Sequence, residues 1–222
     1  MIEIALDTET TGFDALSGDK IVEIGCVKLK NHIPSDETFH VYINPERIVP
    51  EDSIRVHGLT NEFLDDKPIF SEVASDFLEF ISDYPLVIHN AEFDMGFLNA
   101  ELQNIGLPKI ANKIVDTLLI ARQRYPGSPA NLDHLCKKFS IDNSNRTLHG
   151  ALLDAELLSE VYLEFNGGRE PELLKESQNL KTDSMQSNFI QEKIDIKQRV
   201  FDVSQEELDA YNEMMKKIKK EN

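Results

Sequence analysis

The sequence predicts an α/β domain with a mixed five-stranded sheet, followed by a polar tail. Alternation of apolar and polar residues, typical of strands, dominates residues 1–44, whereas helical periodicity alternates with short apolar runs over residues 70–165. Strands first, and then helices alternating with strands, are typical of a mixed sheet covered by helices. The 222 residues suffice for one sizeable domain and an appendage, at roughly 150 residues per domain.

The first part of the predicted sheet is an antiparallel meander. Ile2, Ile4 and Leu6 alternate with polar or small residues, and two further β-rich runs follow after short links. Short links join neighbouring strands that run in opposite directions. We therefore predict strands at residues 2–8, 21–29 and 39–44, and then a loop rich in Pro, Asp and Glu up to residue 69.

The second part alternates helices with short buried strands. Phe70, Val73 and Phe77 recur at i, i+3 and i+7, which predicts a helix with one apolar face. Asn131 is a predicted N-cap, and Pro or Gly residues follow the ends of several helices. The predicted helices are 70–81, 92–104, 117–124, 132–139 and 150–165, and the predicted strands are 86–89 and 113–116.

Beyond the predicted domain of residues 1–168 the composition becomes polar. Residues 169–198 are rich in Glu, Lys, Ser, Gln and Asn, which predicts a flexible linker. Within residues 199–222, Ser204 and Glu207 form a capping-box pattern. Apolar residues then recur at helical spacing: Leu208, Tyr211, Met215 and Ile218. A short amphipathic helix on a tether is typical of a segment that docks on a partner.

The charge balance restricts the class of function. There are 40 acids and 23 bases, a net charge of −17, which argues against binding nucleic acid through a broad basic surface. It does not argue against an enzyme that acts on phosphodiesters, because divalent cations can supply positive charge locally. No apolar run approaches the roughly 18 residues that a membrane span needs, and the N-terminus is acidic, so we expect a cytoplasmic protein without membrane contact.

Three acidic segments are candidates for a catalytic site. Asp7 and Glu9 lie two residues apart at the end of a predicted strand, so both carboxylates leave the same face and could hold two metal ions. Their other interpretation is a pair of solvated acids leading into a turn. Asp94 follows the buried strand 86–89 in the first turn of a helix, where the helix dipole favours an anion. Taken alone, Asp94 is better explained as an ordinary acid at a helix start.

The third segment contains His149 and Asp154. In a regular helix a spacing of five places them about 140° apart, which is poor for holding one ion side by side. Asp154 lies on an apolar helix and therefore needs a counter-charge. His149, at the mouth of the helix, can take a proton from a water molecule near neutral pH. Its other interpretation is a surface histidine.

Together, the three segments resemble the motifs of the DnaQ-like 3′ to 5′ exonucleases, the members of the DEDD superfamily that have a histidine in the last motif. The matching segments are DTETTG at 7–12, NAEFD at 90–94 and RTLHGALLD at 146–154, with VHG at 56–58. The resemblance covers nearly all of residues 1–165. It implies a ribonuclease H-like fold with helices on both faces of the sheet. It also implies that His149 is the catalytic base. Two Mg²⁺ or Mn²⁺ ions would be held by four acids: Asp7, Glu9, Asp94 and Asp154.

The resemblance also implies a substrate and partners. Five residues would contact the terminal nucleotide of a DNA 3′ end: His57, Asp52, Asp7, Glu9 and Asp154. Asp52 departs from the family pattern, which usually has Glu at this position. Proofreading beside the catalytic subunit of a replicative DNA polymerase is the expected role, with residues 199–222 as the docking segment. Residues 169–174 lack the Gln-rich apolar motif that binds sliding clamps, which places clamp contact in doubt. A small stabilising subunit is a further possible partner.

Two other functions remain open from the sequence. An exoribonuclease that trims RNA 3′ ends could use the same fold and the same acids. A non-catalytic subunit that stabilises a polymerase is the other alternative, although the presence of all five catalytic-type residues argues against it.

Overall fold

The computed structural model describes residues 1–168 and Gln205. Its centre is a five-stranded sheet with the order β3-β2-β1-β4-β5. β1, β2 and β3 form an antiparallel meander, whereas β4 pairs in parallel with β1 and β5 in parallel with β4. The strands are β1 (Ile2–Thr10), β2 (Ile21–Lys30), β3 (Ile33–Tyr42), β4 (Leu86–Ile88) and β5 (Ile114–Asp116). The predicted mixed five-stranded sheet is confirmed.

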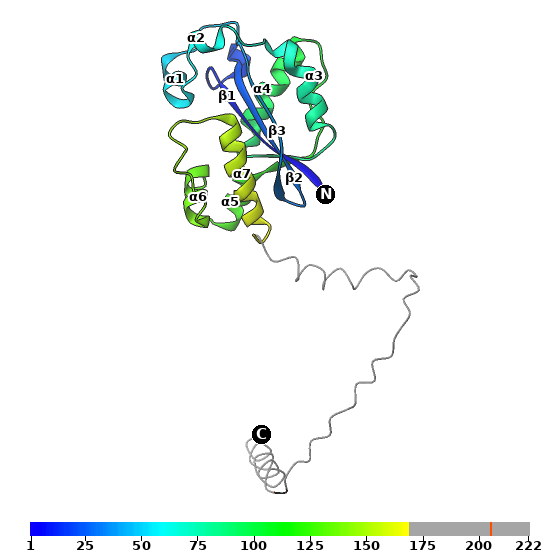
Figure 1. The fold of residues 1–222 in the computed structure, drawn as a ribbon, viewed down its shortest axis with the longest axis vertical. Helices are drawn as coiled ribbons and strands as arrows, with labels where there is room; N and C mark the ends of the chain where they lie inside the picture. Colours follow the sequence, from blue (N-terminus) through cyan, green and yellow to red (C-terminus); the bar gives the residue numbers. More distant parts are fainter. Residues whose placement is uncertain (169–204, 206–222) are drawn as a thin grey trace, which may run out of the picture. The chain divides into compact units, whose positions relative to one another are not determined.

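Helices cover both faces of this sheet, as predicted (Figure 1). Odd-numbered positions of β1, such as Ala5, pack in the cluster formed with α5, α6 and α7, whereas even-numbered Ile4 and Leu6 pack in the cluster formed with α3 and α4. The helical elements are η1 (Ala15–Ser17), α1 (Glu51–His57), α2 (Asn61–Leu64), α3 (Phe70–Ile81), α4 (Ala91–Asn104), α5 (Thr117–Arg124), α6 (Leu132–Phe139) and α7 (Ala151–Phe165).

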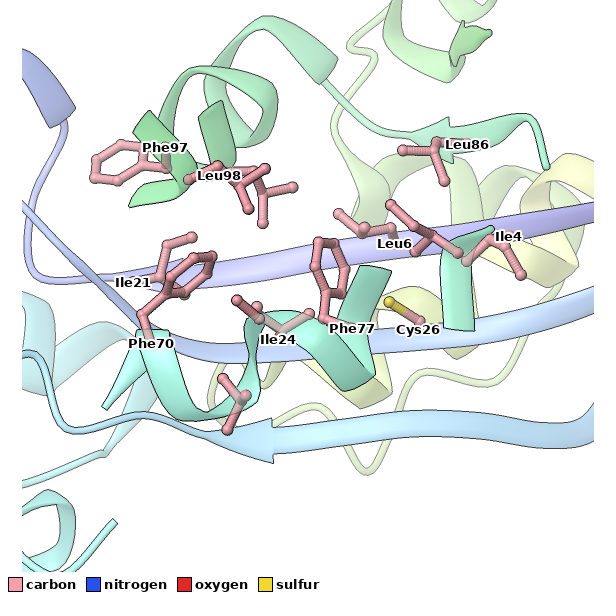
Figure 2. Packing of buried hydrophobic residues seen from close by; sticks show 14 of the residues in the cluster. Ile4, Leu6, Ile21, Ile24, Cys26, Phe70, Phe77, Leu86, Phe97 and Leu98 are labelled. Atoms are coloured by element: carbon pink, nitrogen blue, oxygen red, sulfur yellow. The ribbon is translucent and has the colours of Figure 1, made fainter. Parts of the chain in front are cut away.

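The larger core lies between the sheet and helices α3 and α4. Figure 2 shows Phe77 of α3 beside Leu6 of β1, with Phe97 and Leu98 of α4 nearby. Phe77, Phe97 and Leu98 are at most 2% exposed. Burial of such side chains contributes about 1.5–3 kcal/mol each, so this packing fixes the position of α4 against the end of the sheet.

The structure corrects two predicted boundaries. β3 begins at Ile33 rather than residue 39, because Asn31 and His32 both adopt positive φ angles (53° and 67°) and form a tight hairpin with β2. The segment 45–69, predicted as a loop, contains α1 and α2. Helix α1 has acids in its first turn and ends at Gly58 in the left-handed conformation, two helix signals that the polar composition concealed.

The predicted linker 169–198 lies outside the described residues, and so does the predicted docking segment 199–222 apart from Gln205. Among the helices that the structure describes, none has the length and apolar character needed to cross a bilayer.

Candidate active site

Asp7 and Glu9 lie near the end of β1 and share one face of the sheet, as predicted. Ala5, two residues before Asp7, packs in the cluster that α7 completes, so both carboxylates lie on the α7 face. Thr8, between them, lies on the opposite face, toward α4. Side chains from both faces can therefore meet at this end of the strand.

Asp94 reaches the same region from the first turn of α4. It is 3% exposed, and its Oδ1 accepts hydrogen bonds from the amide and the hydroxyl of Thr8, at 3.1 and 2.7 Å. Burial raises the pKa of Asp94 to about 7, although the bonds from Thr8 act in the other direction. The structure thus places Asp94 in the helix turn that the sequence predicted, with a partner that the sequence did not indicate.

Asp154 lies in the first turn of α7, which closes over the sheet at Gly25. Gly25 is the partner of Asp7 in the β1–β2 register. A Cβ atom at Gly25 would lie 2.2 Å from the carbonyl carbon of Ala151, so only glycine permits this approach. The contact brings the start of α7, and with it Asp154, next to the acids of β1.

Arg146 supplies the counter-charge that the position of Asp154 requires. Its Nε and Nη2 lie 2.6 and 2.7 Å from Oδ1 and Oδ2 of Asp154, and its Nη1 lies 2.8 Å from Oδ1 of Asp133. The side chains of Arg146 and Asp154 are 6% and 4% exposed. The apolar helix around Asp154 predicts a counter-charge but does not say which residue supplies it. Arg146 is the only arginine or lysine between residues 139 and 168, and this fact is the sequence signal that identifies it.

His149 and Asp154 contact each other, although a regular helix would place them about 140° apart. Nδ1 of His149 lies 3.3 Å from Oδ2 of Asp154. The 140° estimate assumed one continuous helix, whereas α7 begins at Ala151 and Gly150 is its N-cap. His149 therefore lies in the preceding loop, where its amide donates to the carbonyl of Val56 at 3.0 Å.

A second contact sets the tautomer of His149. Nη2 of Arg146 lies 2.7 Å from Nδ1 of the ring. Because the guanidinium can only donate, Nδ1 acts as the acceptor, and a neutral ring carries its proton on Nε2. The contact with Arg146 must break before Nδ1 can accept a proton.

The structure brings the acids close enough to disfavour each other's ionisation. One ligand atom each from Glu9, His149 and Asp154 lies within 4.8 Å of the others; Asp7 and Asp94 are not part of this group. Burial and the charges of Asp94, Glu9 and Asp154 raise the pKa of Asp7 well above its usual value. Burial and the charge of Asp154 raise the pKa of Glu9 to about 8.

Asp154 behaves differently from the other three acids. Burial opposes its ionisation, but the hydrogen bonds and the charge of Arg146 outweigh burial and lower its pKa. Four carboxylates with one guanidinium leave an excess of negative charge, and carboxylate oxygens are the ligands that Mg²⁺ and Mn²⁺ prefer. The donor set therefore fits divalent cations.

A cavity of about 220 Å³ adjoins the acids and contains both of the other predicted site residues, His57 and Asp52. His57 is 5% exposed; its Nδ1 accepts the amide of Leu59 at 3.0 Å, and its Nε2 has no hydrogen-bond partner among the described residues. A buried N–H without a partner is costly and suits a ligand acceptor. Asp52 is exposed and pairs with Arg55 of the same helix. Phe13 and Phe93 form an apolar part of the cavity wall.

Comparison with known proteins shows what the chain is similar to. The model of the exonuclease family matches residues 4–162. The chain is 48% identical to the DNA polymerase III subunit epsilon of Rickettsia felis over 223 residues, which cover 98% of this chain and 97% of that protein. It is 47% identical to the subunit of the same name from Escherichia coli K12, over 75% of this chain and 72% of that protein.

Solved structures share the fold. Exonuclease X in complex with a 5′ overhanging DNA duplex matches with a TM-score of 0.60 at 23% identity, over 74% of this chain and 90% of that chain. The nuclease domain of 3′hExo, a DEDDh family member bound to rAMP, matches with a TM-score of 0.64 at 20% identity, over 75% and 92%. These likenesses confirm the ribonuclease H-like fold that the sequence motifs predicted.

Proposed function

We propose that this chain, which belongs to the exonuclease family, is a metal-dependent 3′ to 5′ exonuclease that removes mismatched nucleotides from DNA. The observation that carries the proposal is the convergence of three separate segments at one end of β1. Asp7 and Glu9 come from the strand, Asp94 from α4, and His149 and Asp154 from the start of α7. Hydrolysis of a phosphodiester is a reaction that such a set of oxygen ligands and one imidazole can support.

We further propose that the chain is the proofreading subunit, epsilon, of DNA polymerase III. Two relatives, both with 47–48% identity, carry that name, and the alignment with the Rickettsia felis protein includes 98% of this chain. A net charge of −17 supports a subunit role. A protein with few bases to bind DNA depends on a polymerase to deliver the frayed primer end.

The acids Asp7, Glu9, Asp94 and Asp154 would hold two Mg²⁺ or Mn²⁺ ions. When bound, such ions would stabilise the attacking and leaving oxygens of an in-line displacement. The charges balance if Arg146 stays beside Asp154: four carboxylates and one guanidinium carry −3, two divalent cations add +4, and one phosphodiester adds −1. The guanidinium thus offsets the charge of the scissile phosphate, which the acids and the cations alone would leave unbalanced.

The other residues hold the substrate and move a proton. His57 would donate from Nε2 to the terminal nucleotide in the cavity that Asp52 also lines. His149 would take the proton of the attacking water at Nδ1, which requires that Arg146 first gives up its bond to this atom. The product expected from this reaction is a deoxynucleoside 5′-monophosphate.

Incubation of the full-length chain with a 3′-mismatched DNA primer, with and without Mg²⁺, tests the proposal. We expect release of deoxynucleoside 5′-monophosphates only with Mg²⁺, and near-complete loss of this release in Asp7→Ala. A parallel RNA substrate tests the alternative: faster release from RNA than from DNA would indicate an exoribonuclease. No release from either substrate would leave only a non-catalytic assembly role.

The partners belong to the proposal as well. Residues 199–222 would dock on the catalytic alpha subunit of the polymerase, through the stripe that contains Leu208 and Tyr211. The linker 169–198 would allow the exonuclease domain to reach the primer end while the tail stays bound.

A further inference from the structure

Thr8 lies between the two acids of β1 but faces the other side of the sheet. Its amide and its hydroxyl both donate to Oδ1 of Asp94, at 3.1 and 2.7 Å. Thr8 and Asp94 are 6% and 3% exposed, so water is largely excluded from this contact. Hydrogen bonds to a carboxylate are stronger than those between neutral groups, and low solvent access strengthens them further.

The amide of Thr8 has no acceptor in a neighbouring strand, because β1 extends beyond the end of its parallel neighbour β4. Ile4 donates its amide to the carbonyl of Pro85 at 2.9 Å, and the two-residue period of a strand turns the amide of Thr8 to the same side. β4 ends at Ile88, and Asp94 of the following helix takes the place of the next strand acceptor. The sheet edge thus ties one carboxylate oxygen of Asp94 to β1.

We propose that the hydroxyl of Thr8 is a positioning group that orients Asp94 for metal binding. A single bond from the amide would let the carboxylate pivot, whereas two donors on Oδ1 restrict its rotation and leave Oδ2 for a cation. The inference rests on the proposed function, because it takes Asp94 to be a metal ligand. Hydrogen-bond partners of metal ligands typically change metal affinity by roughly 10- to 100-fold.

The test compares Mn²⁺ binding to full-length variants, measured from the EPR signal of free Mn²⁺. Thr8→Val removes the hydroxyl and keeps the shape of the side chain, and we expect it to weaken Mn²⁺ binding by roughly 10-fold or more. Thr8→Ser keeps the hydroxyl, and we expect it to restore most of the affinity. Thr117→Val is the matched control: it removes the hydroxyl of another buried threonine, whose hydrogen bonds are with Ile88 and His89 and not with any of the four acids.

Each outcome decides between the hypotheses. Wild-type affinity in Thr8→Val, with a clear loss in Asp94→Asn, overturns the role of Thr8 and leaves the proposed metal site intact. Equal losses in Thr8→Val and Thr8→Ser also overturn it, since the loss would then not come from the hydroxyl. If the wild-type chain takes up no Mn²⁺, the proposed metal site fails and the inference fails with it. Thr8→Ala replaces Thr8→Val in the comparison if the valine variant does not fold.

Discussion

Arg146 and Asp154 form a bidentate ion pair, with bonds of 2.6 Å from Nε to Oδ1 and 2.7 Å from Nη2 to Oδ2. Both side chains are buried, and the same guanidinium reaches His149 and Asp133. Arg146, in the loop before α7, therefore connects helix α6 with the predicted base, His149, and with a predicted metal ligand, Asp154.

Replacing Arg146 with Met leaves Asp154 buried without its counter-charge. We expect metal-free Arg146→Met to lose about 3–5 kcal/mol of unfolding free energy, because removal of one partner from a buried pair leaves the other charge uncompensated. Mn²⁺ can then compensate Asp154, so the rise in Tm on adding Mn²⁺ should be larger than in the wild type. Arg47→Met, which removes a more exposed partner of Asp19, should cost at most about 1 kcal/mol. Equal Mn²⁺ stabilisation of Arg146→Met and wild type would contradict this view.

Stability without metal should fall as pH rises. The pKa of Glu9 is about 8 in the folded chain, against an ordinary value of 4.5. Between these values the folded state binds a proton that the unfolded state has released, so the unfolding free energy decreases with rising pH. Asp154 has a lowered pKa, and its contribution is already complete above its ordinary value of 3.8.

Urea unfolding in EDTA between pH 5.5 and 8 measures this dependence. Glu9→Gln cannot ionise at this position, and we expect its unfolding free energy to fall less steeply than that of the wild type. Saturating Mg²⁺ should flatten the wild-type curve as well, because a cation stabilises the ionised form. Identical slopes in the wild type and Glu9→Gln would show that Glu9 titrates near its ordinary pKa.

The two interpretations of His149, base or metal ligand, predict different binding results. If His149 is the base, His149→Ala should lose roughly 10²- to 10⁴-fold in rate and keep the wild-type affinity for Mn²⁺. Weakened Mn²⁺ binding would instead indicate a ligand, since one ring nitrogen of His149 lies within 4.8 Å of a carboxylate oxygen of Glu9 and of one of Asp154. His134→Ala, in α6, is the control for loss of a histidine. Near-normal turnover in His149→Ala would return His149 to the class of surface histidines.

Gly25 should tolerate no side chain. A Cβ atom there would lie 2.2 Å from the backbone of Ala151, so Gly25→Ala must push the start of α7, with Asp154, away from the sheet. We expect a loss of about 1–3 kcal/mol or more from overpacking, and weaker Mn²⁺ binding. Gly96→Ala, in the interior of α4 with open space around it, should be neutral or stabilising by up to about 1 kcal/mol. Chemical denaturation of both variants tests this contrast.

The tail should serve association rather than catalysis. A chain that ends at Gly168 keeps every residue of the candidate site, so we expect it to degrade single-stranded DNA at close to the full-length rate. It should not co-elute with the alpha subunit in size-exclusion chromatography. Leu208→Asp with Tyr211→Asp should weaken the association in the full chain, because two charges would have to be buried at the interface. Undiminished binding by the shortened chain would place the docking surface on residues 1–168.

Local pattern is sufficient for most of the elements and for the acidic candidates and His149, whereas His57 and Asp52 follow only from the family resemblance. Alternation along β1 predicts that Asp7 and Glu9 share a face, and the cap Asn131 predicts the start of α6; the structure has both. Such signals depend on residues within a few positions of each other, so the chain itself carries them. The segment 45–69 is an exception, because its helix signals are short and its composition is polar.

Contacts between distant residues could not be derived in this way. Thr8 and Asp94 are 86 positions apart in the sequence. They form a hydrogen bond because β1 extends beyond the end of β4 and the packing of α4 holds Asp94 at that edge of the sheet. The contact of His149 with Asp154 depends on where α7 begins, and Gly25 sets how closely α7 approaches the sheet. Periodicity shows which face a side chain takes, but the packing of helices against the sheet decides which other side chain it meets.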